Sequence, residues 1–148
     1  MDKNILYYGI ELDEDSKELL KEKFGEHPGW KIFCHHMTSI FNRGGVELTA
    51  WEERWFKENE DKMIFLIVTH YAESDSVAAV RVMTNAPCRN RYRHITLGVN
   101  PEKGGKPVDS NDLTGWTLTE PMILTGHTKI WMRYIKREKK KKKENLGN

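Results

Sequence analysis

The sequence has few cysteines, no long apolar stretch and no metal-ligand pattern. Its 148 residues include two cysteines, Cys34 and Cys88, and neither belongs to a CxxC pair or to a His/Cys cluster with zinc-ligand spacing. No segment reaches the roughly 18 apolar residues that cross a membrane, and the N-terminal residues lack the basic and apolar regions of a signal peptide. We therefore expect an intracellular, cytoplasmic protein with two free thiols and with no metal, no cofactor and no membrane contact.

The glycine pattern of P-loop nucleotide-binding proteins is also missing. Residues 104–107 (Gly-Gly-Lys-Pro) match part of it, but the pattern requires a glycine where Asn100 stands and a serine or threonine where Pro107 stands. Internal repeats and long Pro/Ser/Gly-rich linkers are absent as well. The sequence therefore predicts a single folded domain.

Charge is uneven along the chain, although the total of +2 is small. The end of the chain, residues 136–148, holds seven basic and two acidic side chains, which leaves a net charge of −3 on the preceding 135 residues. We divide the chain into a domain at residues 1–135 and a basic tail at residues 136–148. Such a tail is typical of a solvated, disordered end, and it is also suited to holding nucleic acid by charge or to nuclear import.

Strand and helix signals predict an α+β domain with a largely antiparallel sheet. Two helices are expected: residues 15–24, which end at Gly25, and a helix that starts with a capping box formed by Thr49 and Glu52. The predicted strands are residues 5–12, 30–41, 63–71, 76–83, 92–99, 116–124 and 129–135. Strands outnumber helices and do not alternate with them regularly, which disfavours a doubly wound parallel fold.

Two of the six histidines stand in the same tripeptide, His-x-Thr. The two copies are residues 36–38 (His-Met-Thr) and residues 94–96 (His-Ile-Thr), and both fall inside predicted strands. Because side chains alternate along a strand, the histidine and threonine of each copy project to one face and the middle residue to the other. Each strand is thus expected to offer one side to the core and one to a polar site. On this alternation, His35 should face away from His36.

Two such units that face each other are suited to metal-independent cleavage of a phosphodiester. One neutral imidazole takes a proton from the attacking oxygen, and the other, protonated, gives one to the leaving oxygen. The threonine hydroxyls donate hydrogen bonds to the non-bridging phosphate oxygens. The candidate catalytic residues are His36, Thr38, His94 and Thr96. The alternative is that they are ordinary half-buried strand residues.

This pair of motifs in a small α+β domain resembles the 2H phosphoesterase superfamily, which includes the LigT-like RNA phosphodiesterases and the cyclic phosphodiesterase domain of tRNA ligases. Residues 104–111 (Gly-Gly-Lys-Pro-Val-Asp-Ser-Asn) are similar to the tRNA-ligase branch in particular. The resemblance implies a two-lobed fold of mostly antiparallel sheets around a central cleft, with two or three helices outside and one motif in each lobe.

The same resemblance implies roles for the four candidate residues. His36 and His94 would be the acid/base pair, and Thr38 and Thr96 the phosphate ligands, for an RNA end with a 2′,3′-cyclic phosphate or for a cyclic or short oligonucleotide. The two motifs are only 58 residues apart, which is a departure from the superfamily and implies a trimmed intervening lobe.

Basic and aromatic residues near the motifs are candidates for substrate binding. Arg89, Arg91 and Arg93 precede the second motif and suit a polyanion, or else form an ordinary exposed basic turn. We select Tyr8 and Arg93 as substrate contacts, because an aromatic ring beside the cleft can stack on a nucleobase. Core packing is the alternative for the tyrosine.

Three functions agree with these features. The first is a metal-independent phosphodiesterase that acts on RNA or a nucleotide bearing a cyclic phosphate or phosphodiester and needs no obligate protein partner. The second uses the same chemistry on a cyclic oligonucleotide messenger, as some small viral members of the superfamily do. The third is a non-catalytic RNA-binding domain that uses the basic tail and the arginines.

Overall fold

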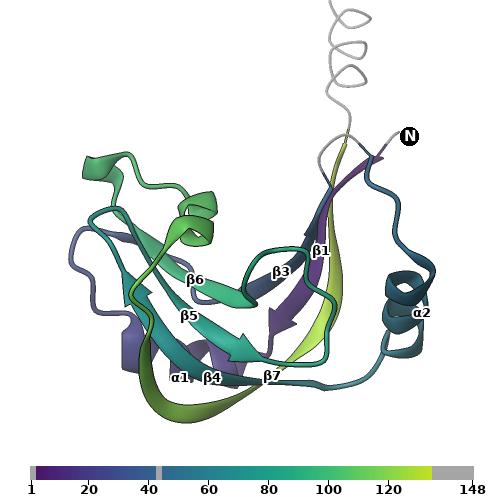
Figure 1. Ribbon diagram of the computed structural model, residues 1–148, viewed down its shortest axis with the longest axis horizontal. Helices are drawn as coiled ribbons and strands as arrows, with labels where there is room; N and C mark the ends of the chain where they lie inside the picture. Colours follow the sequence, from purple (N-terminus) through teal and green to yellow (C-terminus); the bar gives the residue numbers. More distant parts are fainter. Residues whose placement is uncertain (1–2, 43–44, 135–148) are drawn as a thin grey trace, which may run out of the picture.

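The structure is a computed structural model that describes residues 3–42 and 45–134, and the predicted basic tail lies outside these residues (Figure 1). The elements are, in chain order, β1 (Lys3–Leu12), α1 (Glu14–Phe24), β2 (Lys31–Ile32), β3 (His36–Phe41), α2 (Ala50–Glu58), β4 (Ile64–Glu73), β5 (Val77–Met83), β6 (His94–Val99), the 3-10 helices η1 (Pro101–Lys103) and η2 (Pro107–Asp112), and β7 (Thr117–Tyr134).

Six of the strands close into one antiparallel barrel. Around the barrel the order is β6, β3, β1, β7, β4 and β5, and the pairing of β5 with β6 returns to the start. The short strand β2 is an extra strand that pairs with β6. The predicted two-lobed 2H phosphoesterase fold with a central cleft is therefore wrong, because a single closed six-stranded barrel with one extra strand and two short α-helices takes its place.

The length of β7 explains why the sheet does not divide into two lobes. Sequence signals predict two strands here, residues 116–124 and 129–135, interrupted by Pro121 and Gly126. The segment instead forms one strand that pairs with β4 over residues 117–126 and with β1 over residues 126–134. Gly126 is the residue at which β7 changes its pairing from β4 to β1. A glycine is required there, since a Cβ would lie 2.5 Å from the backbone oxygen of Glu11. One continuous strand thus joins the two parts of the sheet.

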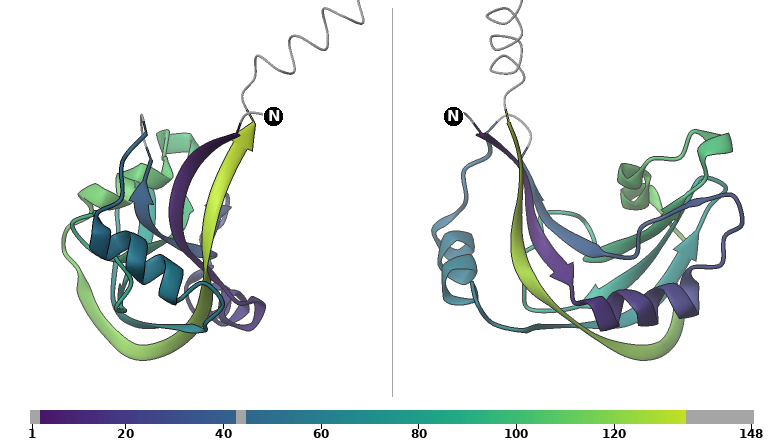
Figure 2. Two further views of the ribbon diagram at one scale, coloured as in Figure 1. Left: turned by 90° about the vertical axis from the view of Figure 1, so that its right-hand side faces the viewer. Right: turned by 180° about the vertical axis from the view of Figure 1, so that it is seen from behind.

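The inside of the barrel is the main hydrophobic core. It holds fully buried side chains from all six barrel strands, including Ile10, Met37, Leu66, Val80, Ile95 and Leu124. Leu20 of α1 and Trp55 of α2 join the same core, although the two helices lie on opposite sides of β1 and β7 (Figure 2). Burial of this apolar surface stabilises the fold, and the side chains that alternate with it face outward.

Local sequence signals account for both α-helices. The predicted capping box is present at α2: the Thr49 side chain accepts a hydrogen bond from the Glu52 backbone N–H, and the Glu52 carboxylate accepts one from the Thr49 N–H. Helix α1 ends at Gly25, as predicted, and both helices are confirmed. Neither α-helix within the described ranges is long and apolar enough to cross a membrane.

A break in the backbone divides the strand predicted at residues 30–41. Cys34 adopts a φ of 53°, in the left-handed region that ordinary residues rarely visit, so β2 ends before it and β3 begins only at His36. Both predicted free thiols are confirmed, with Cys34 buried and Cys88 partly buried. The break matters for the candidate site, because it lies two residues before the first motif.

Candidate active site

The two His-x-Thr motifs lie side by side on neighbouring antiparallel strands. Met37 of β3 pairs with Ile95 of β6, and both middle residues are fully buried in the barrel core. The flanking histidines and threonines therefore face outward. Continued by one residue in each direction, this register sets His36 opposite Thr96 and Thr38 opposite His94, which is an approximate local two-fold arrangement.

His94 is held by a hydrogen bond from its Nδ1 to a backbone carbonyl. The Nδ1 atom lies 3.0 Å from the oxygen of Tyr92, and the side chain is 8% exposed. A carbonyl oxygen only accepts, so Nδ1 carries the hydrogen and the neutral ring has its lone pair on Nε2. Burial lowers the pKa of His94, and the Tyr92 carbonyl opposes that shift because it favours the protonated ring.

His36 lies in a stack of aromatic rings. Its ring centroid is 5.2 Å from that of Tyr7 and 5.0 Å from that of Trp131, and its Nε2 is 3.1 Å from the Thr38 hydroxyl oxygen. Burial is the main reason that the pKa of His36 is lowered to about 3; positive charge on His35, on His94 and on Lys129 adds to it. In the free protein this imidazole is neutral at physiological pH.

His35 contacts His36 instead of facing away from it. The two Nδ1 atoms are 2.6 Å apart and the rings stack at 4.7 Å between centroids. The expected alternation fails because His35 precedes β3 and follows the left-handed Cys34. One Nδ1 must donate and the other accept, so the pair shares one proton at this contact.

Thr96 has a buried hydroxyl partner that the sequence did not single out. Its Oγ1 lies 2.8 Å from the Oγ of Ser110, a residue of η2 that is 2% exposed. The segment after β6 is packed onto the outer face of the sheet by a second apolar cluster that includes Ala79, Val99 and Leu113. The η helices consequently lie over β6 (Figure 1). No local motif identifies Ser110, because only the fold brings η2 back to Thr96.

The structure does not bring Tyr8 to the histidines. Tyr8 packs against Phe56 of α2, with ring centroids 5.7 Å apart, while its neighbour Tyr7 stacks on His36. A change of register between Tyr8 and Gly9, together with another between Ile5 and Tyr7, interrupts the simple alternation along β1. Sequence alone could not decide which tyrosine faces the site.

The three arginines before the second motif have different environments. Arg89 forms a structural contact, since its Nε donates a hydrogen bond of 2.8 Å to the buried carboxylate of Glu52. That bond is the main reason that the pKa of Glu52 is lowered to about 2. Arg91 and Arg93 line a separate cavity, and Arg93 also donates from Nε to the backbone oxygen of Ala86 at 2.9 Å.

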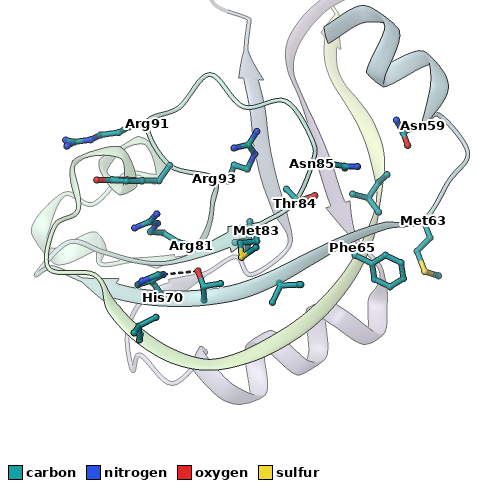
Figure 3. A pocket seen from close by; sticks show the side chains of 16 residues that line it. Asn59, Met63, Phe65, His70, Arg81, Met83, Thr84, Asn85, Arg91 and Arg93 are labelled. Atoms are coloured by element: carbon teal, nitrogen blue, oxygen red, sulfur yellow. Dashed lines mark hydrogen bonds between the residues drawn. The ribbon is translucent and has the colours of Figure 1, made fainter. Parts of the chain in front are cut away.

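This cavity, of about 1050 Å³, lies along the outer faces of β4 and β5 (Figure 3). Arg81, Arg91 and Arg93 lie toward one end of it, and Met63 and Phe65 at the other. It does not include the four His-x-Thr side chains, but it begins one strand away from them, because Arg81 of β5 pairs with His94 of β6.

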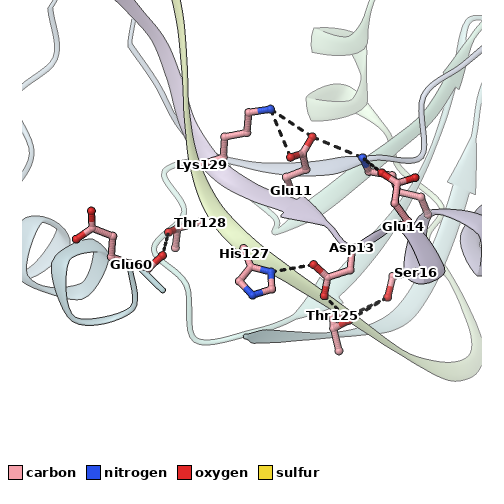
Figure 4. Close-up of polar contacts among 10 residues, drawn as sticks. Glu11, Asp13, Glu14, Ser16, Glu60, Thr125, His127, Thr128 and Lys129 are labelled. Carbon is pink, nitrogen blue, oxygen red and sulfur yellow. Dashed lines mark hydrogen bonds and ion pairs between the residues drawn. The ribbon is translucent and has the colours of Figure 1, made fainter. Parts of the chain in front are cut away.

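A polar network borders the site on the side of β1 and β7 (Figure 4). Lys129 forms an ion pair of 3.4 Å with Glu11, which also pairs with Lys17 at 3.6 Å. Nearby, Asp13 accepts hydrogen bonds of 2.8 Å from the Thr125 hydroxyl and from Nδ1 of His127. The network ties β7 to the start of α1 and gives His127 a structural role.

No protein-family model and no curated protein matches this sequence. Across residues 3–42 and 45–134, no three His, Cys, Asp or Glu side chains gather as a metal-binding group. The function is therefore inferred from the geometry around the two motifs.

Proposed function

We propose that this protein is a metal-independent phosphodiesterase that hydrolyses a 2′,3′-cyclic phosphate or a phosphodiester of RNA or a nucleotide. One observation carries the proposal: the pairing of Met37 with Ile95 gathers two histidines and two threonines on one face of neighbouring strands. A lone strand histidine has many ordinary explanations, but two identical units in a two-fold arrangement match a reaction that needs a base and an acid on opposite sides of one phosphorus. The proposal rests on this geometry and not on a two-lobed fold.

The reaction is an in-line displacement at phosphorus. One neutral imidazole removes a proton from water as the water oxygen forms its bond to phosphorus. The bond from phosphorus to the ribose oxygen breaks, and the protonated imidazole gives that oxygen its proton. The hydroxyls of Thr38 and Thr96 donate hydrogen bonds to the non-bridging oxygens, where negative charge develops. The Ser110 Oγ lies 2.8 Å from the Thr96 Oγ1, and when Ser110 donates this hydrogen bond the Thr96 hydrogen is available to the phosphate.

The hydrogen-bond partners favour His36 as the base and His94 as the acid. The Tyr92 carbonyl stabilises the protonated form of His94, whereas burial, and then the positive charge around it, keeps the His36 ring neutral. A bound phosphate adds negative charge between the two rings and raises the pKa of both, which supplies the proton that the acid requires.

The test is a turnover assay of the full chain on a short RNA that ends in a 2′,3′-cyclic phosphate, run with excess EDTA. We expect the wild type to open the ring and His36→Ala and His94→Ala to lose at least a hundredfold in rate, which is the usual contribution of a general acid or base. His127→Asn is the matched control, because it removes a histidine that pairs with Asp13 and belongs to neither motif.

Turnover that is unchanged in both alanine variants would refute the two-histidine mechanism. If the RNA is not a substrate, the same variants are assayed on a cyclic dinucleotide. Histidine-dependent hydrolysis there would assign the chemistry to a messenger, and turnover of neither substrate would overturn the proposal.

A further inference from the structure

A row of side chains extends from the candidate catalytic pair across the outer face of the barrel. His94 pairs with Arg81 on β5, and Arg81 pairs with His70 on β4. Side chains of directly paired residues project to the same face with their Cβ atoms about 5 Å apart. Arg81 is therefore the neighbour of His94 on the next strand, and it lines the cavity together with Arg91 and Arg93.

The Arg81 guanidinium is fixed by two aromatic rings. It lies 4.2 Å from the ring centroid of Tyr92 and 5.8 Å from that of Trp116, and Arg91 lies 5.2 Å from the same Tyr92 ring. Tyr92 thus supports the arginines with its ring and holds His94 with its backbone carbonyl. Stacking on the ring faces orients the guanidinium groups and leaves their N–H edges available.

Within the described part of the chain, no carboxylate forms an ion pair with these arginines. Among residues 3–42 and 45–134, the ion pairs involve other cations, and none includes Arg81, Arg91 or Arg93. Arg89, only two residues from Arg91, shows the contrast, because Glu52 satisfies it. Three uncompensated guanidinium groups at one end of a cavity form a positive site, and guanidinium edges match phosphate oxygens in pairs.

The other end of the cavity is apolar and open. Phe65 at that end is 58% exposed (Figure 3). Met83, which is 62% exposed, and its strand partner Ile67 lie between Phe65 and the arginines and continue the apolar surface. Planar apolar groups such as nucleobases bury favourably on such a surface, and the aromatic ring of Phe65 adds a stacking partner. The cavity thus combines sites for a phosphate and for a base.

We propose that this cavity binds the nucleotide adjacent to the one whose phosphate is cleaved, with Arg81 and Arg91 holding its phosphate. The inference rests on the proposed function and extends it: the preferred substrate is an oligonucleotide strand, and a mononucleoside cyclic phosphate fills only part of the site. On this proposal the preference for an oligonucleotide over a mononucleoside cyclic phosphate comes from the cavity and not from the basic tail.

The first experiment measures kcat/KM of the full chain for a short RNA with a terminal 2′,3′-cyclic phosphate and for a mononucleoside 2′,3′-cyclic phosphate. We expect the double variant Arg81→Gln/Arg91→Gln to lower the ratio of the two values at least tenfold, chiefly through a higher KM for the RNA. Arg54→Gln/Lys57→Gln removes the same charge, two positive charges, from exposed positions on α2 and should leave the ratio unchanged. The ratio for Arg81→Lys should lie between those of the wild type and Arg81→Gln/Arg91→Gln, because lysine keeps the charge but lacks the planar guanidinium.

An equal fall in the ratio for Arg81→Gln/Arg91→Gln and for Arg54→Gln/Lys57→Gln would overturn the proposal, as would an unchanged ratio in both. The second experiment separates this outcome from failure of the proposed function, because it needs no turnover. Fluorescence anisotropy measures the Kd of a labelled RNA with a terminal 3′-phosphate. If neither cyclic phosphate is turned over, a tenfold weaker Kd in Arg81→Gln/Arg91→Gln alone still supports the cavity as an oligonucleotide site, and an unchanged Kd refutes it.

Discussion

The burial of His36 makes the stability of the protein sensitive to mild acid. In the folded state burial, and then the positive charges of His35, His94 and Lys129, lower the pKa of His36 to about 3. In the unfolded chain the same imidazole titrates near its ordinary value of about 6.5. Below that pH the unfolded chain binds a proton that the folded protein does not, so the free energy of unfolding falls as the pH is lowered.

The size of the effect follows from the difference between the two pKa values. Each pH unit below the unfolded value costs about 1.4 kcal/mol until the folded value is reached, so acidification from pH 7.5 to pH 5.0 removes about 2 kcal/mol through His36. His94 acts in the same direction because burial also lowers its pKa. The pKa of Glu52 is lowered to about 2, and its contribution is lost only below about pH 4.5, outside this range.

The assay is urea unfolding followed by tryptophan fluorescence at pH 7.5 and pH 5.0. The wild type should lose about 2 kcal/mol more than His36→Gln, which lacks the titrating ring. Thr38→Val is the matched control, because it alters the same cluster and keeps all its histidines. An NMR titration of the His36 ring gives the pKa directly. A midpoint near 6.5, or an equal loss of stability in wild type and His36→Gln, would show that His36 is not buried in this stack.

Three further predictions concern the site and its support. Because the pKa values of His36 and His94 are both lowered from about 6.5 in the free protein, the bell-shaped profile of kcat/KM against pH should reach its maximum below pH 6.5; a maximum above pH 7 would contradict this. Ser110→Ala should lower kcat about tenfold and leave the far-ultraviolet circular dichroism spectrum unchanged, since it removes one hydrogen bond to Thr96; an unchanged kcat would exclude the positioning role. Arg89→Met should reduce the free energy of unfolding at pH 7, because the buried Glu52 carboxylate loses its partner, and equal stability in a urea titration would refute the pairing.

The positions of most elements could be predicted from local signals. The helix over residues 15–24 corresponds to α1, the capping box of Thr49 and Glu52 starts α2, and the two strands on either side of the turn at residues 72–75 pair as β4 and β5. Each of these depends on neighbours a few residues apart, and that is the range in which capping, alternation and turn chemistry act.

The arrangement of the strands could not be predicted in the same way. The two-lobed fold was implied by the resemblance of the two motifs to a known family, and it was wrong because the two motifs lie on neighbouring strands of one closed barrel. The division of the last strand in two was also wrong, since β7 continues through Pro121 and Gly126. The placements of His35 and Tyr8 failed for a related reason, since one left-handed residue and one register shift interrupt the alternation on which they depended. Pairing with distant segments determines where strands end and where bulges form, and local composition carries no information about that pairing.

The sequence by itself determined which residues share a face within each motif. A period of two along an extended chain sets His36 with Thr38 and His94 with Thr96, whatever lies around them. Only the tertiary structure decided that the two strands are neighbours, that Ser110 returns to Thr96, and that Arg81 lies one strand from His94. Those contacts join residues far apart in the chain, and they exist because closing the barrel buries the apolar faces of all six strands at once.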